Sequence, residues 1–185
     1  MKDMNMNLDV LGDVFVHKST SYKYYWVLSL LDYVERGRLR CSINEVVVGM
    51  MLRGWDEATM EQRSVGGQDR LYERIRELKR LLKIGNGVDK EEIRMALLAG
   101  LCDAEVRKIF VSLEGNVPYR FLSPWIESKS NSEVERLSRG FENGCPYGIW
   151  TEMVKINPEW IDYLKEHSGE LKKGVEEKLN EYLNK

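Results

Sequence analysis

The chain has 185 residues, of which 43% are hydrophobic and 31% are charged, and its formal net charge is −2. These values are typical of a globular chain that buries a core without disulfides or a structural metal. The three cysteines lie far apart and form no CxxC pair, which argues against a zinc knuckle and favours reduced thiols in the cytoplasm. With neither a signal peptide nor a run of about 18 apolar residues, we expect no secretion and no membrane partner.

The first part of the chain predicts two helices with a short extended piece between them. Candidate N-caps at 19–21 open a helix that ends near Arg36, and its apolar residues recur at three- and four-residue spacing. Ser42 and Glu45 then form a capping box, which predicts a second helix that ends near Trp55.

A third predicted helix carries most of the positive charge. Polar residues 56–67 predict a loop, and the helix follows from about residue 68 to Lys83. Gly85-Asn86-Gly87 is interpreted as its C-cap and turn. Residues 63–83 hold seven Arg or Lys against three acids, a local balance of +4.

A helical wheel places the basic side chains in a stripe beside the apolar face, which consists of Leu71, Ile75, Leu78, Leu81 and Leu82. Such a stripe could bind a nucleic-acid backbone. The alternative is an ordinary solvated face, partly neutralised by Glu73 and Glu77 through pairs three or four residues apart. The candidate nucleic-acid-binding residues on this helix are Arg70, Arg74, Arg76, Lys79, Arg80 and Lys83.

The second half predicts further helices and one β-hairpin. Asp89 and Asp103 are expected to cap two helices, the first over 90–100. Residues 115–126 contain two prolines and are expected to be non-helical, whereas 132–141 is expected to be helical. A small hairpin is predicted within 146–156, with its turn at Thr151-Glu152. Asn157-Pro158-Glu159 predicts a helix start, and a last helix is expected over about 170–184.

Together these elements predict a mainly α fold: a multi-helix domain with a small β-hairpin. We expect residues 1–185 to form one domain, which could divide into 14–85 and 88–185. The first three helices are loosely winged-helix-like, but the 12-residue gap before the third is too long for a compact helix-turn-helix.

The aromatic residues leave two interpretations open. Tyr119–Trp125, with Arg120 inside it, could stack on nucleic-acid bases, so Arg120 joins the candidate binding residues. Aromatic rings flanked by prolines more commonly anchor a loop to a core. In the first helix, Tyr22, Tyr24, Tyr25 and Trp26 surround the helix, so at least one ring is expected to face another segment.

The catalytic candidates are weak. An HNH nuclease site needs a histidine base and further metal ligands close together, and His17 and His167 are the chain's two histidines. Glu77-Leu78-Lys79 and Glu170-Leu171-Lys172 match the Glu-x-Lys of other nucleases, but both lie in helical patterns where residues two apart point in different directions. We expect no catalytic residue, no metal and no cofactor in this chain.

Three short segments resemble a known group of proteins. They are Ser-Tyr-Lys-Tyr-Tyr-Trp at 21–26, Val-Pro-Tyr-Arg-Phe-Leu-Ser-Pro-Trp at 117–125, and Ile-Asn-Pro-Glu-Trp at 156–160. Their order and spacing resemble the region that precedes the nuclease domain in HNH endonuclease-like bacterial proteins, over about 14–183. In that group the HNH domain follows the last helix, so the resemblance implies either a fragment or a short relative, without the catalytic residues.

Two functions are therefore expected. The first is a non-catalytic recognition or accessory module of an HNH endonuclease-like protein, with DNA and a separate nuclease domain as partners. The second is a protein-interaction or dimerisation module without a nucleic-acid role. The interaction or dimerisation module is suggested by a stripe of apolar residues that continues to the last helical turn. These residues are Leu171, Val175, Leu179 and Leu183.

Overall fold

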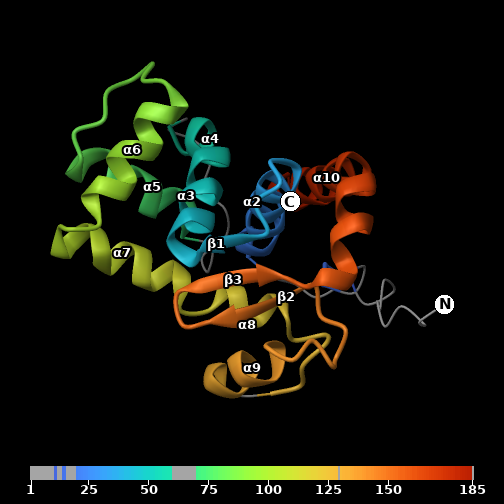
Figure 1. Cartoon of the computed structure of the whole chain (residues 1–185). Helices are drawn as coiled ribbons and strands as arrows, with labels where there is room; N and C mark the ends of the chain where they lie inside the picture. The colour runs from blue at the N-terminus through green and yellow to red at the C-terminus, as the bar shows by residue number, and fades with distance from the viewer. Residues whose placement is uncertain (1–10, 12–13, 16–19, 60–69, 129, 185) are drawn as a thin grey trace.

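The computed structural model describes residues 11, 14–15, 20–59, 70–128 and 130–184 (Figure 1). The fold is mainly helical with one small antiparallel sheet, as the sequence predicts. The helices are α2 (Tyr22–Glu35), α3 (Ile43–Arg53), α4 (Trp55–Thr59), α5 (Leu71–Leu81), α6 (Lys90–Gly100), α7 (Ala104–Glu114), α8 (Val117–Phe121), α9 (Asn131–Ser138) and α10 (Ile161–Leu183). The strands are β1 (Arg40–Ser42), β2 (Tyr147–Trp150) and β3 (Met153–Ile156), and a 3-10 turn, η1, covers Pro158–Trp160.

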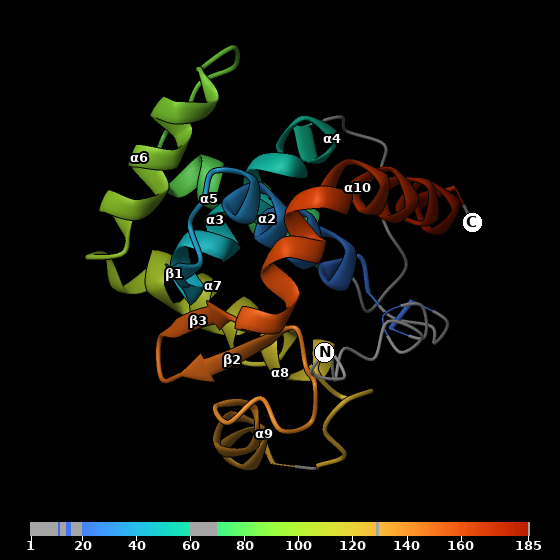
Figure 2. The ribbon, with the colours of Figure 1, turned by 45° about the vertical axis from the view of Figure 1, so that its right-hand side comes forward.

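Helix α2 is the centre of the fold. It lies between α3 and α10, and α5, α6 and α7 are grouped beyond α3 (Figures 1 and 2). Its aromatic residues surround the helix because each ring meets a different neighbour. Tyr24 contacts Tyr182 of α10, Tyr25 shares a 2.9 Å hydrogen bond with Tyr72 of α5, and Trp26 donates to Tyr147 of β2. The expectation that these rings face other segments is confirmed.

The sheet joins distant parts of the chain. The predicted hairpin is confirmed as β2 and β3, and β3 also pairs with β1, so that Cys41 lies opposite Val154. Thus β1 falls in the short extended piece expected after the first helix. The winged-helix likeness is limited to a strand after α2 that joins a later hairpin, because α4 to α9 all intervene between α3 and β2.

Side-chain caps fix the starts of α3, α6, α7 and η1. The Ser42 capping box is formed, since its hydroxyl accepts from the backbone N–H of Glu45 at 3.1 Å and the Glu45 carboxylate accepts from Ser42. Asp89 and Asp103 also cap α6 and α7 as expected, and Asn157 accepts from the N–H of Glu159 at 3.0 Å.

Three expected boundaries are wrong. Residues 55–59 form α4 rather than the start of a loop, and 60–69 lie outside the described residues. The segment 117–121 is helical, because Pro118 occupies the first turn of α8, where its missing N–H has no helical acceptor to satisfy. The last helix begins at Ile161, nine residues before its expected start at 170, and continues through Gly169.

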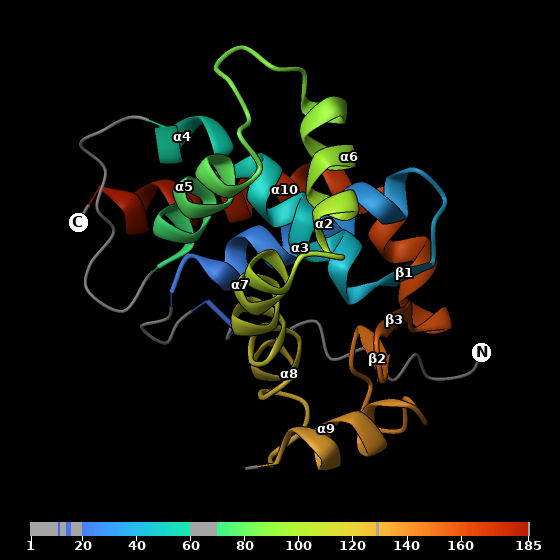
Figure 3. The same ribbon diagram turned by 90° about the vertical axis from the view of Figure 1, so that its left-hand side faces the viewer.

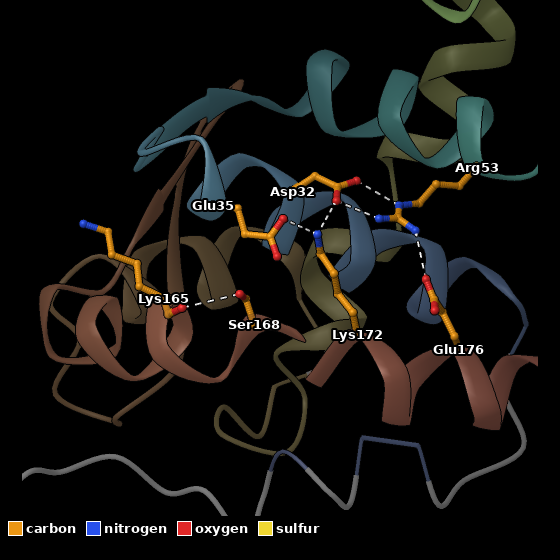
Figure 4. A network of polar contacts seen from close by, with 7 residues as sticks. All are labelled: Asp32, Glu35, Arg53, Lys165, Ser168, Lys172 and Glu176. Carbon is orange, nitrogen blue, oxygen red and sulfur yellow. Dashed lines mark hydrogen bonds and ion pairs between the residues drawn. The ribbon is translucent and has the colours of Figure 1, made fainter. Parts of the chain in front are cut away.

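Helix α10 changes direction along its length (Figure 1). Figure 4 places Ser168 on its first arm and Lys172 on its second, so the bend lies near the Ser168-Gly169 pair, a combination at which helices commonly kink. The second arm packs along α2. Among the described residues, no helix has the length and apolar character needed to cross a membrane.

Candidate functional site

A network of charges fixes the second arm of α10 to the core (Figure 4). Arg53 donates to both carboxylate oxygens of Asp32, at 2.9 and 2.7 Å, and its other amine lies 3.4 Å from Glu176. Lys172 lies 2.6 Å from Asp32 and also pairs with Glu35. Two cations are therefore matched by three carboxylates from α2 and α10.

The network lowers the pKa of two of its carboxyl groups. Burial raises the pKa of Asp32, but the hydrogen bonds and charges of Arg53 and Lys172 outweigh it, so the pKa lies below its ordinary value. The hydrogen bond from Lys172 lowers the pKa of Glu35. Both groups are thus ionised at neutral pH, and the network is a structural clamp without an open coordination site.

Helix α5 presents the predicted basic stripe. Its buried face consists of Leu71, Tyr72, Ile75 and Leu78, so it extends to Tyr72 on the side of the basic stripe, whereas Leu81, expected to be apolar and buried, is 37% exposed. The buried arc is therefore shifted toward Lys79, which is half-buried, while Arg80 lies in solvent. Arg63 lies outside the described residues.

The N-terminal half of the stripe is neutralised. Arg70 lies 2.9 Å from Glu73, and Arg74 lies 2.8 Å from Glu77, both as pairs three residues apart. The hydrogen bond from Arg70 lowers the pKa of Glu73, so this pair stays ionised. This half of the helix matches the expected alternative of a solvated, charge-balanced face.

The C-terminal half of the stripe keeps its charge. We call Arg76, Lys79, Arg80 and Lys83 the basic cluster. Arg76 donates to the carbonyl oxygen of Ala58 at 3.2 Å, and Lys79 donates to the amide oxygen of Asn86 at 2.6 Å, so both partners are neutral. Among the described acids, none lies within ion-pair distance of the cluster, which therefore carries four positive charges over about two helical turns.

The end of α5 brings the basic cluster to a projecting part of the molecule. Lys83 adopts a left-handed backbone with φ of 53°, and the N–H of Ile84 donates back to Lys79 at 3.0 Å, which ends the helix. The helix thus ends at a Leu82 C-cap followed by the left-handed Lys83, rather than at the expected Gly85-Asn86-Gly87. The turn that follows extends away from the body (Figures 2 and 3). Lys79 and Asn86 line a small polar cleft of about 280 Å³ there.

Arg120 is not part of the basic cluster. It is exposed on α8, which packs against α2, α7 and α9 (Figure 3). It interacts electrostatically with Lys23 of α2, whose pKa is lowered by burial and by the charge of Arg120. The neighbouring rings serve the core: Phe121 is buried and stacks on Trp125 and Tyr147. The aromatic rings of this segment therefore anchor it to the core, which was the second of the two interpretations of the sequence.

The residues considered for catalysis do not converge. Both Glu-x-Lys motifs lie in helices: Glu77 pairs with Arg74, Glu170 lies 3.5 Å from His167, and Lys172 belongs to the network. His17 lies outside the described residues. Within the described part of the chain, no group of three or more His, Cys, Asp or Glu side chains could hold a metal ion.

The cysteines are free thiols in different environments. Burial raises the pKa of Cys41 and of Cys145 to about 12, so neither forms a thiolate at neutral pH, and Cys102 is exposed. A nucleophilic role for the two buried thiols is therefore not supported.

The three segments that carry the family resemblance meet in space. Trp26 donates to the hydroxyl of Tyr147 at 3.0 Å, and that hydroxyl donates to the carbonyl oxygen of Pro118 at 2.6 Å. Rings then continue from Phe121 through Trp125 to Trp160. The resemblance thus rests on residues that build the core, and their meeting in one cluster could not be predicted from local sequence patterns.

An apolar cavity of about 290 Å³ lies beside this cluster, in the elbow of α10. Sequence patterns did not indicate it, because its wall comes from segments that are far apart in the chain. The wall includes Val27, Leu31, Tyr147, Trp160, Leu171 and Val175, and charged residues Glu170 and Lys178 lie at its edge.

The apolar stripe at the end of the chain is largely covered. Val175 and Leu179 are buried, and Leu171 and Leu183 are half-buried against the core. The stripe that motivated a dimerisation module therefore has an intramolecular partner in the body of the fold.

Comparisons of the chain with protein-family models, with curated proteins and with solved structures found no match. The function is therefore inferred from the residues and geometry of the chain itself.

Proposed function

We propose that this chain is a non-catalytic recognition module that binds duplex DNA through its phosphates. The observation that supports this proposal is the basic cluster: four cations at the C-terminal end of α5, none of which forms an ion pair with a described acid. Each Lys or Arg that meets a phosphate releases condensed counterions, which favours binding without reading base sequence.

The arrangement of the cluster suits a phosphate backbone. Arg76, Lys79 and Arg80 fall within an arc of about 100° on α5, and Lys83 follows just after the helix ends. Residues 76–83 span roughly 10 Å, and phosphates along one strand of duplex DNA are separated by about 3.4 Å of axial rise, so the cluster can meet about four of them. Arg80 and Lys83 are exposed and can approach a phosphate without rearrangement of the core.

The role of such binding would be accessory. The resemblance to the region that precedes an HNH domain suggests that the module positions a nuclease, in the same chain or in a separate protein, on its DNA. The described residues hold no converging acids and histidines that could cleave the strand themselves.

Charge-matched variants test the proposal. The first triple variant, Lys79→Gln, Arg80→Gln and Lys83→Gln, removes three charges from the basic cluster. The control, Arg70→Gln, Lys108→Gln and Arg136→Gln, removes three charges that are paired with Glu73, Glu105 and Glu133. Both variants have the same net charge, so a difference between them reports the position of the charge. Binding is measured with a short random-sequence duplex at low salt.

We expect the first triple variant to lose at least about tenfold in affinity, and the control to lose less than about threefold. Equal losses would show that overall charge, and not the basic cluster, controls binding. No binding by the unmodified chain at low salt would reject the DNA role; light scattering at several concentrations would then test the alternative interaction or dimerisation module.

A further inference from the structure

We propose that the cavity in the elbow of α10 binds a medium-chain carboxylic acid, with its apolar body inside and its carboxylate at Lys178. This site is separate from the basic cluster, so the inference does not depend on the proposed DNA role. It rests on the polarity of the wall, the volume, the charge at the edge and the rigidity of α10.

The wall offers almost no hydrogen-bonding group to a ligand or to water. The Tyr147 hydroxyl, which is buried, accepts from Trp26 and donates to Pro118, and the Trp160 indole N–H donates to the carbonyl oxygen of Gly144 at 2.9 Å. The remaining wall is mostly aliphatic. Because the described wall offers few polar partners to ordered water, this cavity is suited to an apolar occupant.

The volume sets the size of that occupant. At about 290 Å³, the cavity is roughly twice as large as an apolar cavity of about 150 Å³ that holds benzene. A body of about ten carbons, as in decanoic acid, is therefore of suitable size.

The positive charge of Lys178 at the edge of the cavity favours a ligand that carries an anionic group. Lys178 lies with its amine 5.5 Å from the centre of the Phe15 ring, and no described acid lies within ion-pair distance of it. Glu170, the acidic residue at the edge, is directed to His167 at 3.5 Å. The ammonium group of Lys178 is thus available to a carboxylate, with the aromatic ring beside it.

The network of Figure 4 keeps this site formed. Lys172 and Glu176 hold the second arm of α10 to Asp32 and Arg53, while Leu171 and Val175 of the same arm line the cavity. A wall fixed in this way does not have to be ordered when the ligand binds, which reduces the entropic cost of binding.

Gly174 provides a selective way to fill the cavity. It lies on the wall, and a Cβ atom added to it would meet no atom within 4 Å. Asn180, in the same arm of α10, is exposed and does not line the cavity. Gly174→Leu and Asn180→Leu both add a leucine side chain to this arm, and only the first occupies the cavity.

The test is titration with decanoate below its micelle concentration, followed by calorimetry and by the fluorescence of the tryptophans, of which Trp160 lines the cavity. We expect saturable binding of one decanoate per chain, a loss of at least about tenfold in Gly174→Leu, and unchanged affinity in Asn180→Leu. Lys178→Gln should weaken decanoate by about two- to fivefold and leave decanol unaffected.

Gly174→Ala, which adds one methyl group, serves if Gly174→Leu does not fold, and should give a smaller loss of affinity. Absence of saturable decanoate binding, or equal affinity of the unmodified chain and the Gly174 variants, would overturn the proposal. Decanol binding as tight as decanoate, with no effect of Lys178→Gln, would overturn the assignment of a carboxylic acid.

Discussion

Two groups of cations in this molecule have opposite environments. Arg53 and Lys172 lie between α2, α3 and α10, where three carboxylates hold them in a half-buried network. The basic cluster on α5 has two neutral hydrogen-bond partners, Ala58 and Asn86, and no described acid. Arg53 and Lys172 therefore stabilise the fold through ion pairs, whereas the basic cluster is available to bind a polyanion.

The difference shows that the charge of a segment does not identify a binding surface. The segment 158–185 has a net negative charge, yet its Lys172 is one of the most strongly paired cations in the chain. The sequence correctly predicts an excess of positive charge on α5. Only the C-terminal half of the helix keeps this excess, because Glu73 and Glu77 pair with the cations of the N-terminal half.

The largest expected effect concerns the network. Asp32→Ala would leave Arg53 and Lys172 half-buried without their shared carboxylate, and we expect the free energy of unfolding to fall by about 2–3 kcal/mol. Glu176→Ala removes a more exposed member and should cost less than about 1 kcal/mol. Urea unfolding measures both, and equal costs would contradict a central role for Asp32.

The network should also make stability depend on pH. The folded pKa values of Asp32 and Glu35 lie below their unfolded values, which are about 4. Their contribution is therefore complete above pH ~4 and is lost as pH falls through the folded values. In the double variant Asp32→Asn, Glu35→Gln, unfolding followed from pH 7 to acid should show a shallower decline; an unchanged decline would assign the acid sensitivity to other groups.

At Lys83 the effect of the backbone can be separated from the effect of the charge. Its backbone is left-handed, and its charge has no ion-pair partner among the described residues. Lys83→Gly relieves a left-handed conformation that costs a non-glycine residue about 1 kcal/mol, so thermal unfolding should show higher stability by about that amount. The same change should weaken DNA binding. Lys83→Gln is the matched control, with weaker binding and no gain in stability; destabilisation by Lys83→Gly would show that its side chain supports the fold.

The smallest expected effect is on the stability of the triple variant Lys79→Gln, Arg80→Gln and Lys83→Gln. Because the basic cluster contributes no described ion pair, its free energy of unfolding should change by less than about 0.5 kcal/mol. A loss comparable to that of Asp32→Ala would place these cations with the structural ones.

The elements of the fold could largely be predicted, because they depend on local signals. Caps such as Ser42 and Asp103 lie within a few residues of the groups that they satisfy. Alternating apolar residues likewise indicated the hairpin. The α8 helix was missed because proline was treated as a breaker, although Pro118 occupies a first-turn position that tolerates it.

The sites could be predicted less well, because they depend on contacts between distant residues. The pairing of β1 with β3, the bond of Asp32 with Lys172 and the wall of the cavity each join segments separated by more than 100 residues. Periodicity within one helix carries no information on such contacts. On α5, the acids of the paired half are local, so their effect could be anticipated, but the neutral partners of Arg76 and Lys79 could not.

The most direct test of the central claim is the salt dependence of DNA binding. Four phosphate contacts predict a slope of about −3.6 for log K against log salt, equivalent to a loss on the order of 100-fold between 50 and 200 mM. In the triple variant of the basic cluster one contact, Arg76, remains, so the slope should become about −0.9. A slope that stays steep in this variant, or a shallow slope in the unmodified chain, would contradict the account.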